Sequence, residues 1–212
     1  MHGPTGRDSA CRHRAKPACA TSRVAMQFRA AQSARTRGQR GFPLFDFDML
    51  GLAPALTAAI QRAGHTQPTP IQGRAIPPAM EGRDILGLAQ TGTGKTLAFG
   101  LPLVHHLLEA PGKPAPKSVK ALVLAPTREL VNQIAEHLRV LTDKTRIRVV
   151  TVVGGQSIGK QIELLSRGTD ILVATPGRLI DLMERGSVDL GSVRHLVLDE
   201  ADQMLDLGFI HA

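Results

Sequence analysis

The chain has 212 residues, of which 42% are hydrophobic, enough to bury the core of one domain of ordinary size. Its net charge of +8 is uneven: residues 1–40 hold nine Lys/Arg and one acid, whereas the remaining residues hold seventeen of each. Overall charge therefore does not indicate what the folded part binds. No apolar run approaches the roughly 20 residues of a membrane span. Both cysteines lie in the basic segment, which fits a reducing, cytoplasmic location.

Residues 1–40 are rich in Arg, Ala and Ser and show no sustained hydrophobic periodicity. This composition predicts a disordered basic tail, with the globular domain at 41–212. Two alternatives remain open. An organellar transit peptide has a similar composition, and the start codon could be assigned too early, with Met26 or Met49 nearer the true beginning.

From Phe45 onward, short β-branched runs alternate with helix-length amphipathic segments. Strands are predicted at 84–89, 120–126, 146–153, 170–175 and 193–200, and helices at 95–110, 127–143, 156–168 and 175–186. The strands are almost continuously apolar, as expected for strands buried on both faces. The alternation predicts an α/β fold with a parallel sheet flanked by helices, in which ligands bind beyond the carboxyl ends of the strands.

A phosphate-binding loop follows the first of these predicted strands. The segment AQTGTGKT, residues 89–96, provides glycines whose backbone N–H groups can surround phosphate oxygens, a lysine for the β/γ-phosphates and a hydroxyl for Mg²⁺. Ala89 stands where the general P-loop pattern has its first glycine. The predicted nucleotide-binding residues of this loop are Thr91, Gly92, Thr93, Gly94, Lys95 and Thr96.

Two adjacent carboxylates end the last predicted strand. Asp199 is expected to hold the Mg²⁺ shell with Thr96, largely through water, and Glu200 to orient and deprotonate the attacking water. With Lys95 these two acids form the predicted catalytic set, and ATP and Mg²⁺ are the predicted cofactors. The sequence thus predicts a P-loop NTPase.

These motifs resemble the DEAD-box ATP-dependent RNA helicase family over Phe45–Ala212. Besides AQTGTGKT and DEAD (199–202), the chain contains GHTQPTPIQ at 64–72, which is similar to the adenine-binding Q motif, and Phe47 at the family's upstream spacing. A glutamine amide offers a donor and an acceptor that match adenine N6 and N7, so Gln72 is expected to select ATP. The resemblance implies that Phe47 stacks on the base and that the domain is the first RecA-like domain.

Three further loops match the family's RNA-contacting motifs: PTREL at 126–130, the glycine pair at 154–155 and TPGR at 175–178. By resemblance, the RNA-binding residues are Arg128, Gly154, Gly155, Thr175, Gly177 and Arg178. Such contacts hold phosphates and sugars without contacting base edges. RNA binding is therefore expected to be independent of sequence and sensitive to salt.

Family members continue into a Ser-Ala-Thr strand and a second RecA-like domain that supplies arginines to the transferring phosphoryl group. We therefore expect an incomplete first domain with little activity alone, and a sheet that lacks a central strand beside the P-loop strand. The alternatives are a truncated non-catalytic ATP- and RNA-binding module or a gene remnant. RNA target and oligomeric state are not predicted.

Two other groups of residues are assigned no catalytic role. The histidines His105, His106, His137 and His195 are not spaced like metal ligands, which favours packing. Met204, Leu205, Leu207 and Phe209 are expected to form a helix that packs on the sheet.

Overall fold

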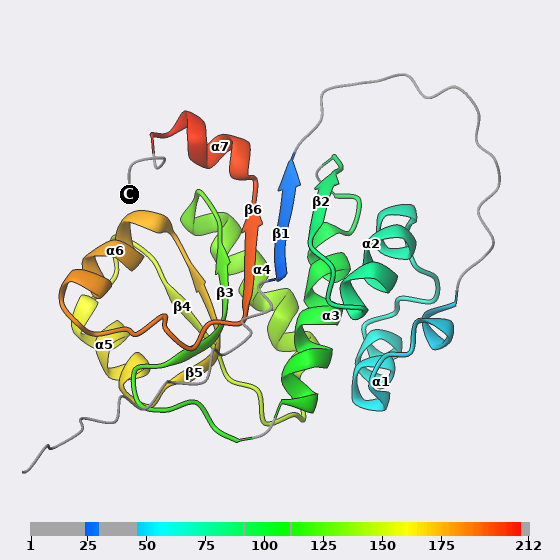
Figure 1. Ribbon diagram of the computed structural model, residues 1–212, viewed down its shortest axis with the longest axis horizontal. Coiled ribbons are helices and arrows are strands. Elements are labelled where there is room, and N and C mark those ends of the chain that lie inside the picture. Colours follow the sequence, from blue (N-terminus) through cyan, green and yellow to red (C-terminus); the bar gives the residue numbers. More distant parts are fainter. Residues whose placement is uncertain (1–23, 30–45, 91, 111, 209–212) are drawn as a thin grey trace, which may run out of the picture.

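The computed structural model describes residues 24–29 by their backbone, together with residues 46–90, 92–110 and 112–208. Its centre is a parallel six-stranded sheet in the order β2-β1-β6-β3-β5-β4 (Figure 1). The strands are β1 (Val24–Arg29), β2 (Ile85–Leu88), β3 (Val119–Leu124), β4 (Val149–Val152), β5 (Thr169–Ala174) and β6 (His195–Asp199). The five predicted strands are confirmed as β2 to β6.

Helices connect the strands on both faces of the sheet. They are α1 (Pro54–Arg62), α2 (Pro70–Met80), α3 (Lys95–Glu109), α4 (Arg128–Thr142), α5 (Ile158–Ser166), α6 (Pro176–Glu184) and α7 (Ala201–Asp206), preceded by the short 3₁₀ helix η1 (Phe47–Leu50). The four predicted helices are confirmed as α3 to α6. The start of α4 is capped by Thr127, whose Oγ1 accepts a hydrogen bond from Leu130 N at 3.2 Å.

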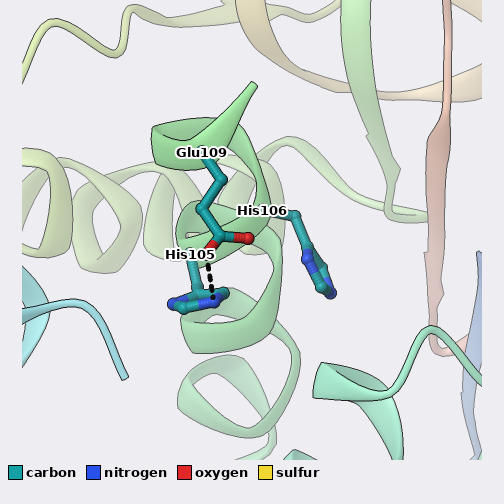
Figure 2. A group of neighbouring side chains, drawn as sticks. All are labelled: His105, His106 and Glu109. Carbon is teal, nitrogen blue, oxygen red and sulfur yellow. Dashed lines mark ion pairs between the residues drawn. The ribbon is translucent and has the colours of Figure 1, made fainter. Parts of the chain in front are cut away.

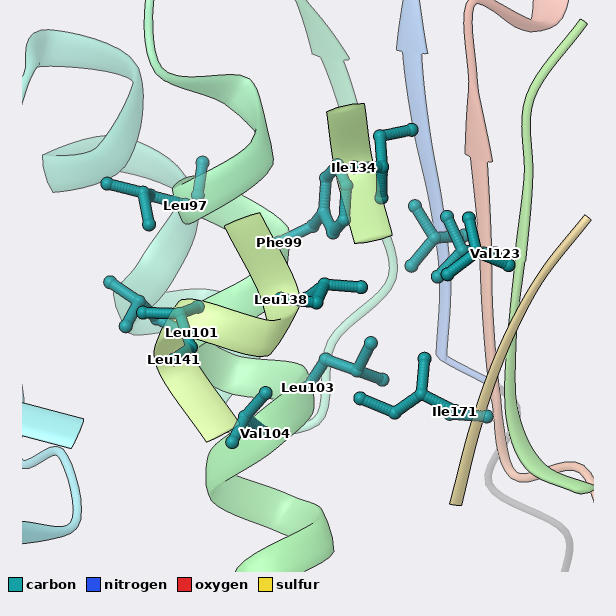
Figure 3. Packing of buried hydrophobic residues seen from close by; sticks show 14 of the residues in the cluster. Leu97, Phe99, Leu101, Leu103, Val104, Val123, Ile134, Leu138, Leu141 and Ile171 are labelled. Atoms are coloured by element: carbon teal, nitrogen blue, oxygen red, sulfur yellow. The ribbon is translucent and has the colours of Figure 1, made fainter. Parts of the chain in front are cut away.

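The central strands β3 and β5 are buried on both faces, which explains their continuous apolar sequences, whereas Leu86 and Leu88 of β2 are exposed. On one face, Val123 and Ile171 pack with side chains of α3 and α4 such as Phe99 (Figure 3). On the other face, Leu122 and Leu172 belong to a second apolar cluster with α5 and α6. Each fully buried side chain of this size contributes about 1.5–3 kcal/mol.

β1 corrects an expectation about the sheet. The predicted absence of a central strand is wrong, because β1 lies between β2 and β6 with Met26 opposite both Ile85 and Val197. This strand, Val24–Arg29, comes from the segment predicted to be a disordered tail, and the rest of residues 1–40 lies outside the described residues. The physical reason is that two facing strand edges leave rows of unpaired N–H and C=O groups, which a parallel third strand satisfies.

The expected packing of α7 is only partly correct. Met204 is 7% exposed, whereas Leu205 and Leu207 are each 55% exposed, and Phe209 lies outside the described residues. A helix of six residues turns only a narrow face toward the sheet. Neighbouring positions along α7 therefore remain open to solvent.

Proline substitutions in β1 test whether it is an integral strand. Consecutive residues of a strand direct their N–H groups to opposite neighbours, so Met26→Pro and Gln27→Pro should each break the ladder to a different strand. We expect each variant to lose about 1–3 kcal/mol of unfolding free energy in urea titrations of the full chain. Ser9→Pro, in the same basic segment, is the control. Unfolding midpoints equal to that control would contradict the role of β1.

Candidate functional site

One edge of the sheet collects all the predicted motifs. Because the strands are parallel, the carboxyl ends of β2, β6, β3, β5 and β4 lie at the same edge (Figure 1). The P-loop follows β2 and the acidic pair ends β6, with only β1 between them. The three loops predicted to bind RNA follow β3, β5 and β4. The strand order therefore separates the predicted nucleotide motifs from the predicted RNA motifs, and these two parts of the edge are called below the nucleotide half and the RNA half.

The P-loop has the backbone conformation that its glycines permit. Gly92 and Gly94 have φ angles of 80° and 88°, in the left-handed region that other residues rarely adopt. α3 begins immediately afterwards at Lys95, so the free N–H groups of its first turn face the loop. Thr93 Oγ1 donates to Gln90 O at 2.7 Å, and Thr91 lies outside the described residues.

Three buried side-chain atoms in the described part of the chain have no hydrogen-bond partner: Thr69 Oγ1, Lys95 Nζ and Asp199 Oδ1. All three belong to the predicted nucleotide motifs. Lys95 is 7% exposed and Asp199 3% exposed. Leaving such groups unpaired is costly. A phosphate oxygen accepting from the ammonium and a Mg²⁺ ion or its water facing the carboxylate would satisfy Lys95 and Asp199, so the residues present fit Mg²⁺-ATP.

The electrostatics of Asp199 agree with this fit. Burial raises the pKa of Asp199 to about 6, the nearby Lys95 ammonium opposes the rise, and the neighbouring Glu200 charge adds to it. Ionising this carboxyl group is therefore less favourable than for a carboxyl group in water, even beside Lys95. A bound divalent cation is the kind of charge that would lower the pKa of Asp199 again.

Glu200 has an unusual backbone. Its φ and ψ angles of 52° and 48° place a non-glycine residue in the left-handed region, at the turn from β6 into α7. Such strained residues persist where the surrounding structure fixes them, often at functional sites. The turn sets Glu200 directly after the buried Asp199, so the two carboxylates occupy different environments.

The predicted adenine-binding residues are both buried. Gln72 is 2% exposed, and its amide is engaged at both ends: Oε1 accepts from Thr69 N at 2.9 Å and Nε2 donates to Gly94 O at 3.1 Å. Phe47 is 3% exposed within the main core cluster. Adenine binding by these residues stays a prediction. The link from Gln72 to the P-loop was not predicted; the capping pattern of Thr69 followed by glutamine three residues later could have indicated only the contact with Thr69.

A cavity of ≈ 560 Å³ lies on the RNA half of the edge. It is lined by all six predicted RNA-binding residues, Arg128, Gly154, Gly155, Thr175, Gly177 and Arg178, with Pro126, Thr127 and Glu129. Arg128 Nη1 donates to Gly154 O at 3.2 Å, so α4 is tied to the glycine pair. Three loops that are distant in sequence thus form one surface.

The histidines of α3 form the group shown in Figure 2, where His105 faces Glu109 and His106 points to the other side. Ligand atoms of the three residues lie within 4.8 Å of one another. His105 Nδ1 accepts the backbone N–H of Ala53 at 3.1 Å, which places its proton on Nε2, 3.4 Å from Glu109 Oε1. A protonated Nε2 cannot bind a metal, so the contacts favour a neutral His105 ring that links α3, through Ala53, to the chain before α1.

The fold and site define a P-loop nucleotide-binding domain of the parallel α/β class. A family model described as DEAD/DEAH box helicase matches residues 69–212. The chain therefore belongs to the DEAD/DEAH box helicase family. The solved structure of a DEAD box protein from the hyperthermophile Methanococcus jannaschii superposes with a TM-score of 0.71 at 36% identity, covering 78% of this chain and 44% of that chain. This likeness confirms the RecA-like fold.

Two curated relatives extend the comparison. The chain is 46% identical over 178 residues to DEAD-box ATP-dependent RNA helicase 52A of Oryza sativa subsp. japonica, covering 79% of this chain and 30% of that protein. It is 46% identical over 164 residues to DEAD-box ATP-dependent RNA helicase CshA of Bacillus licheniformis, covering 77% and 33%. The chain spans about a third of the length of these relatives. Among the described residues, no helix has the length and apolar character needed to cross a membrane.

The partly buried histidine of β6, His195, gives a prediction about pH. Burial, the stacked His106 ring and the Arg194 charge lower the pKa of His195 to about 4. Lys113 and Lys120 line the same pocket and add no counter-charge. The unfolded chain takes up a proton at His195 near pH 6.5 and the folded chain does not, so stability falls as pH drops from about 6.5 to about 4.

We expect this histidine to cost the full chain about 2 kcal/mol at pH 5 relative to pH 8. His195→Phe should remove that share of the loss in urea unfolding, and His65→Phe, at an exposed position, should not. If the unfolding free energies of the wild type and His195→Phe depended equally on pH, the predicted contribution of His195 would be contradicted.

Proposed function

We propose that this chain is the ATP- and RNA-binding part of a DEAD-box ATP-dependent RNA helicase. The observation that carries the proposal is the shared edge of the sheet. Unpaired Lys95 and Asp199 mark a nucleotide half, and six residues from three loops line a cavity on the other half. The names of the rice and Bacillus licheniformis relatives support ATP-dependent work on RNA.

In this proposal the nucleotide half holds Mg²⁺-ATP. The P-loop amides and Lys95 bind the β- and γ-phosphates, and Thr96 and Asp199 hold Mg²⁺, partly through water. Bound Mg²⁺ supplies positive charge to the phosphates and keeps Asp199 ionised. Glu200, the next residue along the chain, orients the attacking water and takes its proton. To contact adenine, the Gln72 amide gives up its hydrogen bond to Gly94 O and bonds to the base instead.

The RNA half holds one strand by its sugar-phosphate backbone. Arg128 is exposed at the start of α4 and provides a cation at the cavity, and Thr175 and Gly177 belong to the first turn of α6, where unpaired N–H groups favour phosphate. Arg178 holds the loops in place, because its guanidinium group donates to the protein oxygens of Gln156 and Gln161. Such contacts do not distinguish bases, and 2′-hydroxyl contacts favour RNA over DNA.

Hydrolysis and remodelling of RNA need more than these residues. In phosphoryl transfer, an arginine directed at the developing charge contributes about 10³–10⁵ in rate. Arg128 and Arg178 line the RNA cavity, not the nucleotide half. We therefore propose that a second RecA-like domain supplies this charge in the working enzyme, and that the present chain alone binds its ligands with little turnover.

RNA binding by the full chain tests the proposal. Two unrelated fluorescent single-stranded RNAs should bind with similar affinity, more tightly than DNA of the same sequence, and more weakly as salt rises. Arg128→Ala should weaken both RNAs by about tenfold, the loss of one charge-assisted hydrogen bond. Arg139→Ala removes an exposed arginine farther along α4 and is the matched control. Absence of RNA binding, or equal losses in the two variants, would refute the assignment.

A further inference from the structure

One glutamine outside the recognised motifs lies behind the RNA cavity. Gln161 on α5 is 3% exposed, and both ends of its amide are engaged. Nε2 donates to Val153 O at 2.9 Å, and Oε1 accepts from Arg178 Nη1 at 3.2 Å. A fully buried polar side chain with both functions satisfied has a specific geometry, because a small displacement would leave donors or acceptors unpaired.

The contacts of Gln161 and Arg178 enclose the glycine pair from both sides. Val153, immediately before Gly154, is held by Gln161, and Gln156, immediately after Gly155, accepts from Arg178 Nη1 at 3.1 Å. The same arginine belongs to α6, the helix that follows the Thr175 loop. One network therefore joins the loop after β4 to the loop after β5.

Flexibility in this loop would be expected without the network. Gly155 has a φ angle of 75°, and glycines lose more conformational freedom on ordering than any other residue. Binding of a ligand to the loop must offset that loss of conformational freedom unless the loop is already ordered in the free protein. The hydrogen bonds on either side of the glycine pair hold the loop in one arrangement before a ligand arrives.

We propose that Gln161 is a positioning residue that pre-organises the two glycine-containing loops of the RNA cavity through Val153 and Arg178. Glutamine suits this role because its amide donates at one end and accepts at the other. Glutamate keeps the acceptor for Arg178 and loses the donor to Val153. Leucine loses both and leaves the Val153 carbonyl and one guanidinium N–H without these partners.

The role of Gln161 in affinity rests on the proposed RNA function, whereas its role in ordering the loops does not. Hydrogen exchange of the backbone amides in 153–156 and 175–178 measures the order of the loops directly. Anisotropy with a fluorescent single-stranded RNA measures the affinity. Binding of fluorescent mant-ATP with Mg²⁺ reports on the P-loop, which follows β2 at the far side of the sheet from β4.

The experiment compares the full-length wild type with Gln161→Leu, Gln161→Glu and the control Gln133→Leu, which makes the same change at an exposed position of α4. We expect Gln161→Leu to speed amide exchange in both loops and to raise the RNA Kd, each about fivefold to tenfold, as for one or two lost hydrogen bonds. Gln161→Glu should fall between, and mant-ATP affinity should stay within about twofold of the wild type in every variant.

The outcomes separate the two proposals. Exchange rates and RNA affinity of Gln161→Leu equal to those of Gln133→Leu would overturn the positioning role. If Gln161→Leu speeds exchange only in the two loops and the wild-type chain binds no RNA, the ordering role is supported and the RNA function is refuted. If Gln161→Leu does not fold, Gln161→Glu decides, since it keeps the side-chain volume and the Arg178 contact.

Discussion

The position of β1 between β2 and β6 sets the geometry on which the site depends. Neighbouring strands lie about 4.8 Å apart, so one intervening strand separates the P-loop strand from the acid-bearing strand by about 10 Å. Parallel pairing on both sides also fixes their relative height, because Phe28 is level with Gly87 and with Asp199. That separation gives room for phosphates and a hydrated cation between Lys95 and the acidic pair.

Opposite charges buried on either side of this gap make the site dependent on its ligand. Lys95 and Asp199 each retain an unpaired polar atom, and burial raises the pKa of Asp199 to about 6. Elsewhere in the described chain, comparable groups are satisfied internally, as in the 3.0 Å pair of Lys120 with Asp170. The contrast indicates that the fold leaves this one place incomplete, which is the expected state of a site that exchanges a charged ligand.

Much of this could be predicted from the sequence. Continuous apolar runs gave the strands β2 to β6, and the loops that follow them could be placed at one edge because parallel strands share a direction. β1 could not be predicted, since six residues of mixed character in a basic segment carry no periodic signal and their pairing partners lie far away along the chain. Gln161 could not be predicted either, because its importance comes from contacts with Val153 and Arg178 that only the folded chain brings together.

The central claim is that Lys95 and Asp199 are completed by the phosphates of ATP and by Mg²⁺. Isothermal titration of the full chain with ATP, with and without Mg²⁺, tests it most directly. The account predicts binding that strengthens at least about tenfold with Mg²⁺, loses that gain in Asp199→Asn, and falls by about tenfold or more in Lys95→Ala, as for a charged hydrogen bond. Lys120→Ala, which removes a lysine already paired with Asp170, should leave ATP affinity unchanged. ATP binding that is indifferent to Mg²⁺ and to both site substitutions would contradict the account.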